Sequence, residues 1–199
     1  INKISIIFIM LYFFISCSAV GKATKTDYYL IDPVNFNNPV LKQDKPISIK
    51  IIDLNIPQYL QRFHMATRST KSRLEFSENN QWGEDLRKNL LRTMSRNLSQ
   101  LLATIEIGTP LNRLKSETDY HLQIDIDKFE QDIDNRVKLI ARWQIISGID
   151  SSFLGVFRAD LQSPLNTQTK DYDQVVYLMQ NLYGELSELI AKSIVLKKK

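Results

Sequence analysis

The sequence holds one thiol, Cys17, and its surroundings indicate the chemistry that it undergoes. A predominantly apolar run from Ile4 to Ile15 precedes it, with Lys3 before the run and the small Ser16 next to the cysteine. About twelve apolar residues are too few to cross a bilayer as a helix, which needs about twenty, but they match the core of a cleaved secretory signal. We therefore predict that residues 1–16 are a lipoprotein signal peptide and that Cys17 becomes lipidated.

Lipidation of Cys17 would hold the protein at a membrane, because two or more acyl chains bind a bilayer stably and one binds only marginally. Phe14 stands where such signals usually have Leu. Ser18, rather than Asp, follows the cysteine, which by resemblance to enterobacterial lipoproteins favours the outer membrane, facing the periplasm. Residues 17–26 are small and polar with two lysines, which predicts a flexible tether to a single domain at residues 27–199.

Side chains that could catalyse a reaction or bind a metal are not clustered in this sequence. It has no G-x-S-x-G motif, and its two histidines, His64 and His121, fall in separate strand-like segments. Five carboxylates faintly resemble a calcium loop but lack its glycine and its closing glutamate: Asp125, Asp127, Glu130, Asp132 and Asp134. We expect no enzymatic activity, no metal and no cofactor beyond the covalent lipid on Cys17.

The charge of the chain is mildly basic and mixed in sign. A formal net charge of +4 with 24% charged residues favours solubility and falls short of the clustered basic residues of nucleic-acid-binding proteins. A mildly basic net charge is compatible with contact to anionic lipid headgroups. Lys88, Arg92 and Arg96 line one side of a predicted helix, and we interpret them as a solvated face or as a docking surface for lipid phosphates or an acidic partner.

Hydrophobic periodicity predicts two long amphipathic helices, at about residues 83–103 and from Val175 to Ile194. Alternation predicts a hairpin of residues 120–127 and 137–145, which places Asp125 opposite or diagonal to Arg142 on the outer face. Further short segments are expected as strands at 28–31, 47–54, 63–68, 73–76, 104–107 and 153–161. Residues 56–60 are expected as a tight turn or a single helical turn, and residues 77–81 as a polar loop.

Two helices and a sheet that each have one apolar face can bury all of these faces in one simple arrangement. The helices cover one side of the sheet, and the other side is left to water or to a partner. The predicted fold class is therefore α+β, a two-layer sandwich with a mainly antiparallel sheet and two long amphipathic helices packed on one face.

Four short motifs occur in order along the predicted domain: Tyr28-Tyr29-Leu30-Ile31-Asp32, Ile56-Pro57-Gln58-Tyr59-Leu60-Gln61-Arg62, Thr67-Arg68 and Trp82-Gly83-Glu84-Asp85-Leu86. In these motifs the chain resembles the PqiC-type ABC-transport auxiliary lipoproteins over nearly all of the mature domain. Gly83 and Asp85 depart from the Ala and Pro that this family more often has.

The resemblance implies a non-enzymatic outer-membrane lipoprotein that docks an MCE-domain protein and supports phospholipid transport between the two membranes. The signature positions that it nominates for partner binding are Pro57, Tyr59, Leu60, Arg62, Arg68 and Trp82. Leu60 and Trp82 have an alternative role in packing the loop against the sheet. A periplasmic lipid-binding carrier is the alternative function, an envelope hydrolase is a third class without a nominated residue, and a homo-oligomer is possible.

Overall fold

The computed structural model describes residues 24–37, 46–112, 117–165 and 171–197, so the predicted signal peptide, Cys17 and most of the predicted tether lie outside them. The helices are α2 (Leu86–Leu101), α3 (Tyr172–Leu196) and the short 3-10 helix η1 (Gln58–Gln61). The strands are β1 (Asp27–Tyr29), β2 (Ile49–Asn55), β3 (His64–Arg68), β4 (Leu74–Trp82), β5 (Ile107–Gly108), β6 (Tyr120–Gln131), β7 (Arg136–Ser147) and β8 (Phe153–Pro164).

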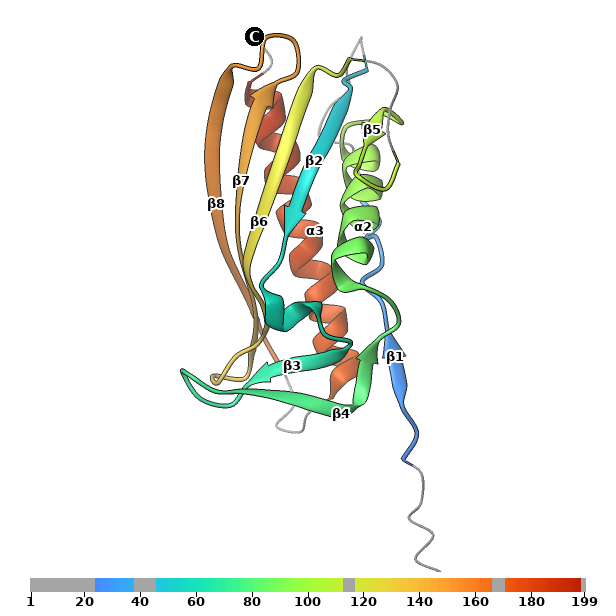
Figure 1. The fold of residues 1–199 in the computed structure, drawn as a ribbon, viewed down its shortest axis with the longest axis vertical. Coiled ribbons are helices and arrows are strands. Elements are labelled where there is room, and N and C mark those ends of the chain that lie inside the picture. Colours follow the sequence, from blue (N-terminus) through green and yellow to red (C-terminus); the bar gives the residue numbers. More distant parts are fainter. Residues whose placement is uncertain (1–23, 38–45, 113–116, 166–170, 198–199) are drawn as a thin grey trace, which may run out of the picture.

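Both long helices pack on one face of a single sheet, so the predicted two-layer α+β fold is confirmed (Figure 1). The hairpin around Asn135 is confirmed as well, because β6 and β7 pair antiparallel and Asn135 turns the chain with a φ of 57°. β8 adds the expected third strand. Asp125 faces Arg142 in register, although Arg142 makes its ion pair with Asp127, at 3.5 Å.

The sheet is mixed, with long antiparallel ladders at β6–β7–β8 and a parallel pairing of β2 with β6. Parallel neighbours require a crossover connection, and here α2 lies within the segment that joins β2 to β6. One edge of β6 is shared, because β2 pairs with it up to Asp125 and β3 touches it again at Gln131. Between these two contacts the chain leaves the sheet and returns through η1.

Residues 77–81 belong to β4, so the prediction of a loop there was wrong. β4 pairs with β1 on one side and with β3 on the other, and most of its side chains are only half-buried. Its polar residues therefore form a strand although they do not alternate with apolar residues along the sequence. The helix begins at Leu86 rather than Gly83, and the Asp85 carboxylate caps it by accepting a hydrogen bond from the Lys88 N–H at 2.9 Å.

The interior between sheet and helices is filled by apolar side chains whose few polar atoms are paired. Tyr183 is fully buried, its ring stacks on Phe129 at 5.9 Å, and its hydroxyl donates to the Leu90 carbonyl at 2.9 Å. The Trp143 indole N–H donates to the Ser193 hydroxyl, also at 2.9 Å. Among the described residues, no helix is both long and apolar enough to cross a membrane.

A row of polar residues on α2 binds the main chain that follows β1. The Asn89 amide accepts from the Ile31 N–H at 2.7 Å and donates to its carbonyl at 3.1 Å, and the Thr93 hydroxyl donates to the same carbonyl. One helical turn further, Asn97 accepts from the Val34 N–H and donates to Ser187 on α3. The segment after β1 is therefore fixed to both helices.

We expect Asn89→Ala to lower the free energy of unfolding by about 2 kcal/mol, because the buried Ile31 N–H loses its acceptor while the carbonyl keeps Thr93. Urea denaturation measures the change. Arg96→Ala, on the exposed side of the same helix, is the control and should change stability by less than about 0.5 kcal/mol. Equal effects of the two variants would show that the Asn89 contacts do not hold the segment.

Candidate functional site

Two of the four sequence motifs fold into the turn η1 and the strand β3, and a side chain from each binds the buried carboxylate of Glu130 on β6. The Glu130 side chain is 1% exposed and pairs with Arg68, whose Nε lies 2.8 Å from Oε1. The Tyr59 hydroxyl donates to the other carboxylate oxygen, Oε2. These three residues, which we call the Glu130 cluster, come from η1, β3 and β6.

The local sequence explains how Tyr59 reaches Glu130. Pro57 has a φ of −57° and its carbonyl accepts from the Leu60 N–H at 3.0 Å, which closes the turn. Leu60 is 3% exposed and anchors the turn in the core. With Leu60 pointing inward, the neighbouring Tyr59 lies over the outer face of β6.

The environment of the Glu130 cluster suits binding and positioning rather than covalent chemistry. Burial raises the pKa of Tyr59 above its ordinary value, and the hydrogen bond to Glu130 and the charge of that carboxylate raise it further. The phenol therefore remains protonated at physiological pH and acts as a hydrogen-bond donor. Since the Arg68 guanidinium also donates to the Lys71 carbonyl at 3.2 Å, the cluster braces the start of the β3–β4 connection.

Two open hollows adjoin the Glu130 cluster. The η1 hollow has a volume of about 460 Å³ and is lined by Gln58, Tyr59, Gln61, Arg62 and Phe76. The lysine hollow has a volume of about 260 Å³ and is lined by Arg68, Lys71, Lys128, Glu130, Asp132, Ile133 and Lys138. Tyr59 thus contributes to the first hollow, and Arg68 and Glu130 contribute to the second.

The structure divides the six signature positions into three environments. Trp82, at 4% exposed, and Leu60 lie in the hydrophobic core, as the packing alternative expects. Tyr59 and Arg68 bind Glu130, and Pro57 is half-buried at the turn. Arg62 is exposed, and its guanidinium lies 4.8 Å above the centre of the Phe76 ring, a cation–π contact.

The other candidate groups from the sequence do not converge. His64 and His121 lie on different strands, with His64 beside Gln81 and His121 opposite Ile146. Asp132 accepts hydrogen bonds from the N–H groups of Asp134 and Arg136 at 2.9 and 3.0 Å. In the part of the chain that the structure describes, no group of three or more His, Cys, Asp or Glu side chains is placed to hold a metal.

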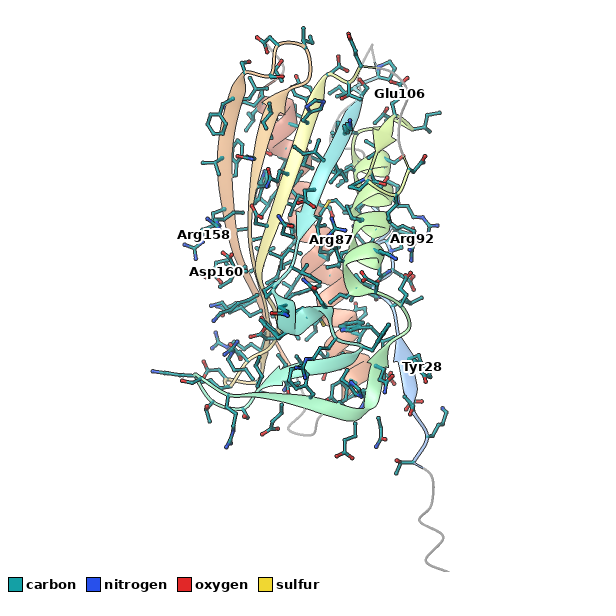
Figure 2. The ribbon with its side chains drawn as sticks, in the orientation of Figure 1. Tyr28, Arg87, Arg92, Glu106, Arg158 and Asp160 are labelled. Atoms are coloured by element: carbon teal, nitrogen blue, oxygen red, sulfur yellow. The ribbon has the colours of Figure 1, made fainter. Side chains whose placement is uncertain are left out.

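The basic stripe on α2 is a solvated helix face with one ion pair. Arg92 pairs with Glu84, and Figure 2 shows Arg92 pointing outward from α2. Lys88 and Arg96 are exposed beside it. On β8, the charged residues Arg158 and Asp160 project away from the helices (Figure 2), and Val156 on the same strand is an exposed apolar residue.

Replacing Arg68 by Ala tests whether the Glu130 cluster supports the fold. The change leaves a carboxylate buried without its cation, so we expect the free energy of unfolding to fall by about 3 kcal/mol in urea denaturation. Arg73→Ala is the matched control, because Arg73 is an exposed arginine of the adjoining connection whose Nε donates to the Ser69 hydroxyl at 3.0 Å. A loss below about 1 kcal/mol for Arg68→Ala would contradict the assignment.

The fold is similar to that of two solved structures. One is an uncharacterized protein with a TM-score of 0.65 at 18% identity, covering 86% of this chain and 99% of that one. The other is the protein XCC0632 from Xanthomonas campestris, described under the family name DUF330, with a TM-score of 0.66 at 13% identity, covering 88% and 96%. At these identities the similarity concerns the fold alone. No curated protein matches the sequence at a significant level.

A family model described as the ABC-type transport auxiliary lipoprotein component matches residues 28–191. The match begins at the first tyrosine of β1, includes the Glu130 cluster and ends inside α3. Because it spans most of the sequence, the chain belongs to the family of ABC-type transport auxiliary lipoprotein components.

Proposed function

We propose that the protein is a PqiC-type docking subunit, anchored through lipidated Cys17 in the outer membrane and facing the periplasm. In this role it binds an MCE-domain protein of an intermembrane phospholipid transport system and catalyses no reaction. Family membership, the signal before Cys17 and the order of the four motifs support the proposal.

The observation that carries the docking role is the braced η1 turn. Because Tyr59 and Arg68 are held by a buried carboxylate, the exposed residues of the turn are presented without a large loss of conformational freedom on binding. These residues are Gln58, Gln61, Arg62 and Phe63, and Phe63 is 57% exposed. Arginine and aromatic residues are enriched among the residues that dominate binding energy at interfaces.

The packing of the core favours docking over the alternative of a lipid carrier. A carrier needs an apolar chamber large enough for acyl chains. Between the sheet and the helices, core side chains such as Leu90, Leu122 and Ile190 are fully buried against one another. The η1 and lysine hollows lie outside this core and are lined mainly by polar and charged residues.

Crosslinking in cells, followed by affinity purification of the tagged protein, should recover an MCE-domain protein. We expect the double variant Arg62→Glu and Phe63→Ser to reduce its recovery at least tenfold, because truncating central interface residues typically costs more than about 1.4 kcal/mol. The control is Lys88→Glu, which reverses a charge on the exposed face of α2 and should leave recovery unchanged. Repeated purification of the wild type without an MCE-domain protein would contradict the proposal.

The anchor is tested by metabolic labelling with an alkyne fatty acid. The wild type should be labelled, and Cys17→Ala should be unlabelled and retain residues 1–16, because the thiol that carries the lipid is missing. Ser18→Asp is the matched variant for sorting: it should keep the label but shift the protein toward the inner membrane on a density gradient. A labelled Cys17→Ala protein would show that the lipid is attached elsewhere.

A further inference from the structure

The lysine hollow lies at the end of the domain where the chain arrives from its anchor. It is formed where the β3–β4 connection meets the β6–β7 turn, since Lys71 belongs to the first and Asp132 and Ile133 to the second. Figure 1 shows this connection, this turn and β1, where the described part of the chain begins, at the same end of the long axis. Tyr28, which is 67% exposed, marks the entry point (Figure 2).

The lining of the hollow is cationic. Four cations and two carboxylates face it, which gives a formal excess of two positive charges. Glu130 is neutralised by Arg68, and Asp132 is occupied by backbone N–H groups of the β6–β7 turn. Lys138 pairs with Asp160 at 3.3 Å, which leaves Lys71 and Lys128 against Asp132, so the net excess is one positive charge and is centred on the two lysines.

We propose that the lysine hollow binds the phosphate group of an anionic phospholipid in the membrane to which Cys17 is tethered. Basic residues next to a membrane are attracted to anionic headgroups by about 1 kcal/mol each, which is about fivefold in binding. Ile133, 45% exposed at the rim, adds an apolar contact beside the charges. The proposal rests on the lipid anchor and not on the MCE partner.

The length of the tether favours a membrane lipid over a soluble phosphate as the source of the ligand. From Cys17 to Thr24, where the described residues begin, seven peptide units extend at most about 25 Å. The entry end of the domain is therefore confined close to the headgroups, where the local concentration of lipid phosphate is high. An exposed tyrosine near this entry point is also typical of residues at a membrane interface.

The test uses the full lipidated protein, reconstituted in vesicles of phosphatidylcholine with or without phosphatidylglycerol. Hydrogen–deuterium exchange is followed at the β3–β4 connection and the β6–β7 turn. We expect slower exchange in both segments with phosphatidylglycerol, and loss of this protection in the double variant Lys71→Gln and Lys128→Gln. The control pair Lys88→Gln and Arg96→Gln removes the same charge from α2 and should keep the protection.

Three outcomes would overturn the proposal. The first is exchange that does not respond to phosphatidylglycerol, and the second is protection that survives in the Lys71 and Lys128 double variant. The third is equal protection by inorganic phosphate or by an added acidic protein segment on phosphatidylcholine vesicles, which would assign the hollow to a soluble ligand. Recovery of the MCE-domain protein in the crosslinking experiment is measured separately, so failure of one proposal leaves the other intact.

Discussion

A carboxylate that is removed from water needs charged and hydrogen-bonding partners, and this requirement organises the end of the domain that holds η1 and β3. Glu130 does not pair with Lys138, directly opposite on β7, because Lys138 pairs with Asp160. The partners come instead from a segment that has already left the sheet at Asn55. Leaving Glu130 buried and unpaired would cost several kcal/mol of folding free energy. The turn at Pro57 and the return along β3 avoid this cost, because they bring Tyr59 and Arg68 to the carboxylate.

The return of the chain at β3 also determines how the N-terminal tether is connected to the core. β3 holds β4, and β4 holds β1, whose last residue, Tyr29, accepts a hydrogen bond from Gly83 at 2.8 Å. Immediately afterwards Ile31 is bound by Asn89 on α2. A force applied to the chain before β1 would therefore act on buried hydrogen bonds rather than on a free strand.

The parts of the fold that depend on local patterns were predictable from the sequence, and the parts that depend on distant partners were not. The β6–β7 hairpin, β8 and both helices follow from alternation and helical spacing, because each buries its own apolar face. β4 was missed because its sheet neighbours, rather than its own hydrophobicity, make it a strand. The parallel pairing of β2 with β6 joins residues about seventy positions apart, and no local signal reports it.

The candidate site shows the same limit. The motif residues Tyr59 and Arg68 were singled out, but Glu130 was grouped with the surface carboxylates of its hairpin, since its burial depends on β3 and η1. The register of the β6–β7 hairpin places Glu130 opposite Lys138 on the outer face, and this register was the signal that could have separated Glu130 from the other carboxylates. Asn89 and Asn97 gave a further signal, because amides inside the apolar half of a helix usually bind main chain.

The Glu130 cluster also determines how the two hollows relate to each other. Tyr59 lines one hollow and Arg68 and Glu130 line the other, so a change at one could reach the other only by moving these three side chains. Breaking a buried and fully hydrogen-bonded ion pair costs more than a single surface contact provides. The cluster is therefore a rigid wall between the two hollows rather than a switch, and a change in one hollow should leave the side chains that line the other in place.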